Sequence, residues 1–116
     1  MSDNPSSNSI PDPVPMERVI DGLQYRTGAG RRIAYDWRPG YEFRYYSTAY
    51  RLHLFVTPRG NYFCQEQETE PDSNEAGRFA WIRLRTLTRG EALWLYHEAK
   101  HKLLGIAEAF PGEIEA

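Results

Sequence analysis

Residues 50–68, YRLHLFVTPRGNYFCQEQE, decide the fold because they encode two strands joined by a tight turn. Apolar side chains occupy every second position from residue 50, and this period of two places them on one face of a strand. Residues 58–61, PRGN, have turn chemistry, and YFCQEQE returns as the second strand. The shared face of the first strand consists of Tyr50, Leu52, Leu54 and Val56.

The segments on either side of this hairpin predict further strands. Residues 22–40 alternate on both sides of Gly28-Ala29-Gly30, which predicts another hairpin. Residues 41–50, YEFRYYSTAY, fit either a strand or an irregular aromatic segment. RFAWIRLRTL at residues 78–87 predicts the last strand. One face of it carries Phe79, Trp81, Arg83 and Arg85, and the other carries Ala80, Ile82, Leu84 and Thr86.

A helix is predicted to follow the last strand. Thr88 and Glu91 have the spacing of a capping box, and Pro111-Gly112 is a stop signal. The fold class is therefore α+β: an antiparallel β-meander of four to five strands with a C-terminal α-helix packed on one face. The apolar stripe of the helix, at three- and four-residue intervals, is Ala92, Leu95, Tyr96, Ala99, Leu103, Ile106 and Phe110.

The chain length of 116 residues predicts a single domain. Residues 1–15 hold four prolines and little apolar surface, so we expect a disordered tail there. The α+β domain is expected over residues 16–112, and residues 113–116 form a short tail. The acidic stretch 66–75 leads into an expected mobile loop, and its role stays open.

Composition predicts a cytoplasmic protein. No apolar run is long enough to span a membrane, and the N-terminus has neither the basic nor the apolar part of a signal peptide. Cys64 is the only cysteine, so an intramolecular disulfide is impossible, which fits a reducing compartment. We expect Cys64 to be a small buried core residue.

Two segments resemble a group of small uncharacterised bacterial and phage-borne proteins. TPRGNYF at residues 57–63 matches their T-x-x-G-x-Y-F hairpin, and LTRGEALWLYHEA at residues 87–99 matches their closing L-[ST]-x-x-E-A helix. The resemblance covers roughly residues 50–99 and rests on turn and cap chemistry. The resemblance implies the same hairpin-and-helix architecture and supplies no function, because such proteins have no established activity.

His97, Glu98 and His101 spell H-E-x-x-H, the motif that places two zinc ligands and a general base on one helix. On the predicted helix both histidines point away from the apolar stripe, whereas a catalytic zinc normally lies in a cleft. No histidine follows His101, and Glu108 lies about two turns further on. We therefore expect no catalytic residues and no cofactor. Zinc held by His97 and His101, with Glu98 as the base, is the alternative.

The outer face of the same helix is a candidate partner-binding surface, because an exposed tryptophan flanked by leucines is typical of interaction hot spots. Burial of this face under another segment is the competing interpretation. The expected partner is another protein of unknown identity or a second copy of the chain, and no membrane is expected. The residues are Leu93, Trp94, His97, His101 and Leu104.

A second surface combines arginines with aromatic rings, if the strands that carry them adjoin. Rings stack on bases while arginine neutralises phosphate, as in proteins that bind single-stranded nucleic acid. Alternatively the arginine stems merely cover the rings, and the pI near 5.9 disfavours a strong nucleic-acid binder. These residues are Arg26, Arg32, Phe79, Trp81, Arg83 and Arg85.

The sequence as a whole predicts a small non-catalytic binding or regulatory module that acts through protein–protein contact. A nucleic-acid-binding module that uses the arginine–aromatic face is the first alternative. A minimal zinc hydrolase built on H-E-x-x-H is the second.

Overall fold

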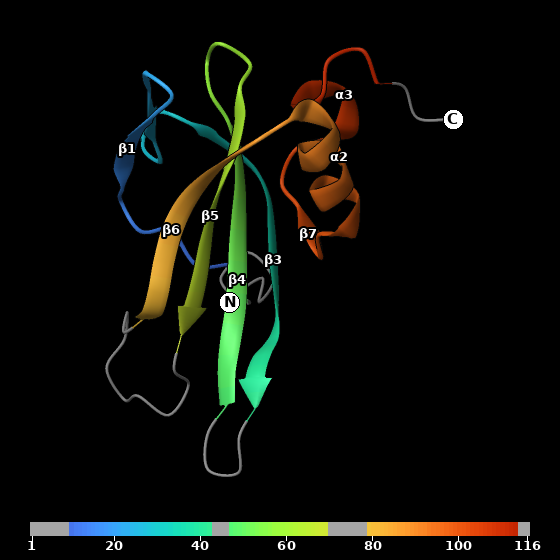
Figure 1. The fold of residues 1–116 in the computed structure, drawn as a ribbon. Coiled ribbons are helices and arrows are strands. Elements are labelled where there is room, and N and C mark those ends of the chain that lie inside the picture. The colour runs from blue at the N-terminus through green and yellow to red at the C-terminus, as the bar shows by residue number, and fades with distance from the viewer. Residues whose placement is uncertain (1–9, 43–46, 70–78, 114–116) are drawn as a thin grey trace, which may run out of the picture.

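The computed structural model describes residues 10–42, 47–69 and 79–113, except for the side chains of residues 39–42, 47, 48, 69, 79 and 80 (Figure 1). A five-stranded antiparallel sheet has the order β6-β5-β4-β3-β7, and β1 and β2 form a separate hairpin. The elements are β1 (Glu17–Ile20), β2 (Leu23–Arg26), β3 (Arg31–Glu42), β4 (Ser47–Val56), β5 (Tyr62–Thr69), β6 (Phe79–Leu87), α2 (Arg89–Glu98), β7 (His101–Lys102) and α3 (Ile106–Ala109).

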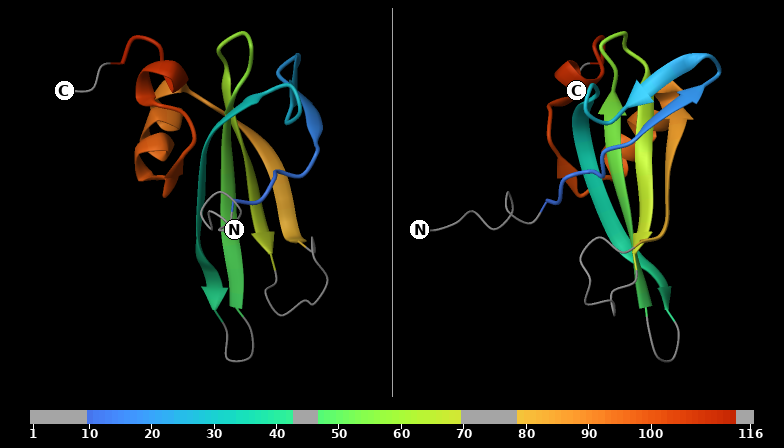
Figure 2. Two further views of the ribbon diagram at one scale, coloured as in Figure 1. Left: turned by 180° about the vertical axis from the view of Figure 1, so that it is seen from behind. Right: turned by 90° about the vertical axis from the view of Figure 1, so that its left-hand side faces the viewer.

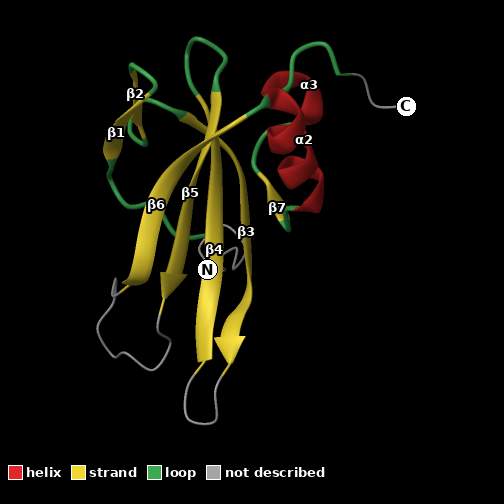
Figure 3. Ribbon diagram, in the orientation of Figure 1, coloured by secondary structure: helices red, strands yellow, loops and turns green. Residues whose placement is uncertain are grey.

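The predicted α+β class with an antiparallel meander is confirmed (Figure 3). The hairpin β4–β5 lies at its centre, with Val56 opposite Tyr62 across the predicted turn. Gly60 closes that turn with φ of +86°, a conformation that glycine adopts without a steric penalty. Leu52 and Leu54 are buried against the helical layer, as their alternation predicts.

The helical layer covers one end of the sheet on one face (Figure 1). It begins with the predicted capping box, in which the Glu91 amide donates to the Thr88 hydroxyl over 3.1 Å and the Thr88 amide donates to the Glu91 carboxylate over 2.8 Å. Three rings join this layer to the sheet. The Phe110 ring stacks on the Tyr62 ring with centroids 4.9 Å apart and meets the Tyr96 ring edge-on at 5.4 Å.

The prediction of one continuous helix as far as Phe110 is wrong. Helix α2 ends at Glu98, and the next residues leave it to pair as β7 with Ala34 and Tyr35 of β3. The Lys100 amide donates to the Asp36 carboxylate over 3.2 Å, a contact 64 residues away along the chain. Open backbone groups on the edge of β3 thus gain partners that a longer helix would not supply. The spacing of the apolar residues fits both one continuous helix and a helix that ends at Glu98 and is followed by β7.

The predicted hairpin across Gly28-Ala29-Gly30 is also wrong. Strand β2 pairs with β1, and β3 pairs with β4 and β7. The turn of the real hairpin is Asp21-Gly22, whose φ angles of 52° and 79° are those of a tight two-residue turn. This Asp-Gly pair is a hairpin signal that the alternation around the later glycines obscured.

The ambiguous stretch 41–50 divides between two strands. Residues up to Glu42 extend β3, and Ser47 begins β4, while residues 43–46 lie outside the described part of the chain. At the acidic stretch 66–75, residues 66–69 belong to β5 and the others are outside the description.

The predicted N-terminal tail includes residues that pack on the sheet. Residues 10–15 cross the face opposite the helices, and the Val14 amide donates to the Gln65 side chain over 2.9 Å (Figure 2). Ordered contacts therefore begin before residue 16, and residues 1–9 are not described. At the other end Glu113 accepts a hydrogen bond from Arg89 over 2.9 Å, and residues 114–116 are not described.

Among the helices that the structure describes, none has the length and apolar character needed to cross a lipid bilayer.

Gly30 provides a test of packing on the face opposite the helices, where the rings of Phe55 and Phe63 stack with centroids 4.8 Å apart. A Cβ atom on Gly30 would lie 3.0 Å from the Phe63 ring and 3.3 Å from the Phe55 ring. We expect Gly30→Ala to lower the free energy of unfolding by about 1–3 kcal/mol, because both rings are buried and must shift. Urea denaturation measures this change.

Gly28→Ala is the matched control, because a Cβ atom there meets nothing within 4 Å. It should change the free energy of unfolding by less than about 0.5 kcal/mol. Equal destabilisation by the two substitutions would show that the close approach of Gly30 to the rings does not limit stability.

Candidate functional site

The sheet face that carries the helices continues beyond them (Figures 1 and 3). Cross-strand pairing brings two rows of side chains together on this part, because residues directly opposite each other share a face. One row is Asp36, Leu52, Glu66 and Arg83, and the next is Arg38, Tyr50, Glu68 and Trp81. We call the surface formed by Arg38, Tyr50, Glu66, Glu68, Trp81, Arg83 and Arg85 the Glu66 face.

Glu66 is the buried carboxylate at the centre of this face, with a side chain only 7% exposed. Its Oε1 accepts from Arg83 Nε over 2.7 Å and from Arg85 Nε over 3.0 Å. Its Oε2 accepts from the Tyr50 hydroxyl over 2.6 Å. These bonds to a charged group are stronger than neutral ones, so they hold three neighbouring side chains in fixed positions.

The protonation state of Glu66 follows from the same contacts. Burial acts to raise the pKa of Glu66, but the hydrogen bonds from Arg85, Tyr50 and Arg83 outweigh it and hold that pKa below its ordinary 4.5. Burial and the neighbouring carboxylate raise the pKa of Tyr50. At neutral pH the pair is therefore an ionised acceptor and a neutral donor, which suits a structural network rather than proton transfer.

Trp81 lies on the edge strand β6 beside this network and is 39% exposed. Its indole N–H donates to the Glu68 carboxylate over 2.7 Å, which fixes the orientation of the ring. The Arg83 guanidinium lies 5.5 Å from its ring centroid, and the Tyr50 ring centroid lies 6.4 Å away. Arg38 extends the surface by lying 4.9 Å over Tyr50. The face thus offers oriented rings and partly exposed guanidinium groups to a ligand.

The structure brings together three of the six residues predicted for nucleic-acid binding, namely Trp81, Arg83 and Arg85. Arg26 lies on β2 and donates to Gln24 over 3.1 Å. Arg32 lies on the opposite face of the sheet and donates to the Pro11 carbonyl over 2.6 Å. The side chain of Phe79 lies outside the description. The predicted surface is therefore smaller than expected and is shared with two glutamates.

Sequence reasoning missed Arg38, Tyr50, Glu66 and Glu68 as members of this surface. A signal was present, because the position of the turn after Val56 fixes which residues of the two strands lie opposite each other. That register places Glu66 opposite Leu52 and Glu68 opposite Tyr50. The alternation in CQEQE then places both glutamates on the tyrosine side.

The predicted partner surface on the outer helix face is divided. Trp94 is 61% exposed, and His97 is exposed beside it. Leu93 and Leu104 instead pack against the core under the helices. His101 lies in β7, with its ring 5.8 Å from the Tyr35 ring. Only Trp94 and His97 remain as a surface on α2.

The H-E-x-x-H residues do not have the arrangement that the zinc motif needs. Glu98 is the last residue of α2, so His97 and His101 do not lie on one helix. His101 faces the Tyr35 ring instead of the side of the helix that carries His97. In the described ranges no group of three or more potential ligands could hold a metal ion.

Two other titratable side chains, those of Cys64 and His53, are buried in the sheet. Burial, with a contribution from Glu66, raises the pKa of the Cys64 thiol to about 12, so the thiol is neutral at physiological pH. His53 is fully buried, and its Nδ1 lies 3.3 Å from Arg32 Nη1. Because arginine can only donate, Nδ1 is the acceptor and the proton lies on Nε2. That atom has no hydrogen-bond partner among the described residues.

Comparison with known proteins identifies no relative, since no family model matches the chain and neither a curated protein nor a solved structure matches it.

The pKa of His53 predicts how the free energy of unfolding depends on pH. Burial, followed by the charges of Arg32 and Arg51, lowers the pKa of His53 from 6.5 to about 3. Between these values the unfolded chain binds more protons, so stability is full above about pH 6.5 and falls as the pH decreases. At pH 5 this residue alone should lower the free energy of unfolding by about 2 kcal/mol.

Urea denaturation between pH 7 and 5 measures this dependence. His53→Gln should flatten the slope, because the amide does not titrate. Val19→Ala, at an exposed position on β1, should keep the wild-type slope because it changes no titratable group. Identical slopes for the wild type and His53→Gln would contradict the prediction.

Proposed function

We propose that this chain is a small non-catalytic binding module that acts through protein–protein contact at the Glu66 face. The observation that supports this most is the fixed, half-exposed ring of Trp81, which Glu68 holds and Arg83 flanks. Tryptophan, tyrosine and arginine dominate interaction hot spots, and side chains that are already ordered lose less entropy on binding.

The chemistry of the titratable groups favours binding over catalysis. Glu66 is ionised and already accepts bonds from Tyr50, Arg83 and Arg85. The Cys64 thiol is neutral and buried. A general base or nucleophile needs a pKa matched to its task and access to the substrate. A cytoplasmic location is part of this proposal, because a single buried thiol fits a reducing compartment.

The alternation of charge favours a protein partner over nucleic acid. Arg83 and Arg85 share the carboxylate of Glu66, so much of their charge is already compensated. Glu68 lies next to the exposed indole, where it would repel a phosphate backbone. The backbone edge of β6 adjoins the same surface, and a partner strand that pairs along it would place alternate side chains over Trp81.

Affinity capture with matched variants tests this proposal. The full chain, Trp81→Ala and Val19→Ala are each immobilised and exposed to a lysate of the cells that encode the protein. Val19 is the control because it is 69% exposed but lies on β1, away from the Glu66 face. We expect a protein that binds the wild type and Val19→Ala and that loses about 30-fold or more in affinity with Trp81→Ala.

Two results would contradict the proposal. If Trp81→Ala captured the partner as well as the wild type does, the contact would lie outside the Glu66 face. Binding of a fluorescent single-stranded oligonucleotide that needs Trp81 and falls steeply with salt would instead support the nucleic-acid alternative. Sedimentation of the purified chain shows whether the partner is a second copy.

A further inference from the structure

Residues 10–16, IPDPVPM, cross the face of the sheet opposite the helices as an extended segment without regular secondary structure (Figure 2). We call this segment the strap. Prolines at positions 11, 13 and 15 fix the φ angle at these positions and remove every second N–H group. The amides that remain include those of Val14, which donates to Gln65, and Met16, which donates to Thr27.

The central anchor of the strap is the Gln65 side chain. Its Oε1 accepts the Val14 amide over 2.9 Å, and its Nε2 donates to the Val14 carbonyl over 2.7 Å. Gln67 Nε2 donates to the same Oε1 over 2.7 Å, which orients the Gln65 amide. Gln65 therefore pairs with the strap as a neighbouring strand would, through the backbone and without reading a side chain.

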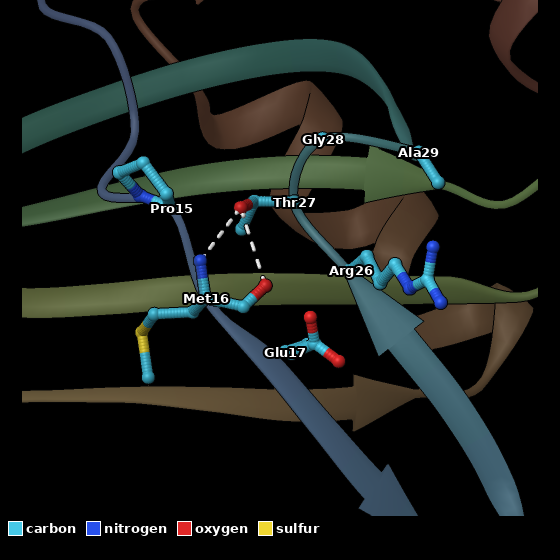
Figure 4. A pocket seen from close by; sticks show the side chains of 7 residues that line it. All are labelled: Pro15, Met16, Glu17, Arg26, Thr27, Gly28 and Ala29. Carbon is cyan, nitrogen blue, oxygen red and sulfur yellow. Dashed lines mark hydrogen bonds between the residues drawn. The ribbon is translucent and has the colours of Figure 1, made fainter.

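Two further anchors hold the ends of the strap, and they also bind its backbone. Arg32 Nη1 donates to the Pro11 carbonyl over 2.6 Å. The Thr27 hydroxyl accepts the Met16 amide over 3.0 Å (Figure 4). The Thr27 amide donates to the Met16 carbonyl over 3.0 Å. A surface hollow of about 460 Å³ lies beside this anchor, with walls that include Pro15, Met16 and Thr27.

The sheet surface beneath the strap, which we call the floor, is polar and buried. Gln65, Gln67 and His53 are each no more than 2% exposed, and His53 Nε2 has no partner among the described residues. His53 lies directly opposite Gln65, so both are on the strap side of the sheet. Buried polar groups cost free energy, and an apolar floor would hold a purely structural segment at lower cost. A buried polar surface whose side chains form hydrogen bonds with a peptide backbone is therefore better suited to a binding site than to a purely structural contact.

We propose that Thr27, Arg32 and Gln65 form a recognition site for extended polypeptide segments with alternating prolines, and that the strap occupies this site as an intramolecular ligand. The partner is a segment of another protein with prolines on both sides of a central residue that keeps its amide N–H. The strap competes with it at a high effective concentration and so keeps the site closed. This site lies on the opposite face from the Glu66 face and does not depend on its function.

The full chain with Val14→Pro tests the proposal, because proline removes the N–H that Gln65 accepts and opens the site. The probe is the synthetic peptide IPDPVPM with ¹⁵N at its valine, observed by NMR with unlabelled protein. We expect the peptide to bind Val14→Pro at least about tenfold more tightly than it binds the wild type. The valine amide of the bound peptide should exchange its hydrogen with water more slowly than that of the free peptide. Asp12→Ala, at an exposed strap position, is the control and should behave as the wild type.

Gln65→Met added to Val14→Pro should abolish peptide binding, because methionine has a similar size and no amide. A probe with proline in place of its valine, IPDPPPM, makes the same test without a second protein variant and should not bind Val14→Pro. Equal binding of both peptides, or equal affinity of the wild type and Val14→Pro for IPDPVPM, would overturn the proposal. If the wild type formed a dimer that Val14→Pro dissociated, the strap of a second copy would occupy the site, and the proposal of an intramolecular ligand would be overturned.

Discussion

The pairing of β4 with β5 is the constraint on which the rest of the structure depends. The turn after Val56 sets its register, and that register decides which side of the sheet receives each side chain of β5. Tyr62 and Cys64 then face the helical layer, while Phe63 faces the N-terminal hairpin. A shift by one residue would exchange these two sets and leave both layers without a core.

Strand β5 changes from apolar to polar at the same point on both faces. On the helical side the change falls between Cys64 and Glu66, and the helices cover only the apolar part. On the other side it falls between Phe63 and Gln65, where the packing of the β1–β2 hairpin gives way to the strap. The half of the strand next to the turn therefore builds the core, and the other half supplies both proposed interaction surfaces.

The sequence predicted those features that depend on neighbouring residues. The central hairpin, the capping box at Thr88 and the side assignment of Trp81 and Arg83 all follow from local spacing. The Asp21-Gly22 turn is equally local, but the glycines at 28 and 30 give a competing hairpin signal. Half of the arginine–aromatic set was brought together, because Arg26 and Arg32 lie on β2 and β3, which do not adjoin β6, while the side chain of Phe79 lies outside the description.

The features that the sequence did not predict depend on contacts between distant residues. The end of α2 follows from the edge of β3, which is more than 60 residues away along the chain, so the helical period of the segment gave no sign of it. The strap has too little apolar surface to predict order, and its central anchor is the side chain of Gln65, 51 residues away from Val14 along the chain. The Glu66 network likewise joins three strands, and its members become neighbours only when the sheet forms.

Amide hydrogen exchange of the full chain, followed by NMR, tests the central role of the β4–β5 pairing most directly. Residues that open only when the whole domain unfolds exchange with the free energy of global unfolding, which denaturation measures independently. We expect the amides of residues 63–67 in β5 that bond to neighbouring strands to reach this limit, and the helical layer to open at lower free energy. Amides in α2 that remain protected while those of β5 exchange would show that the helices persist without the hairpin, and the β4–β5 pairing would then not be the constraint on which the fold depends.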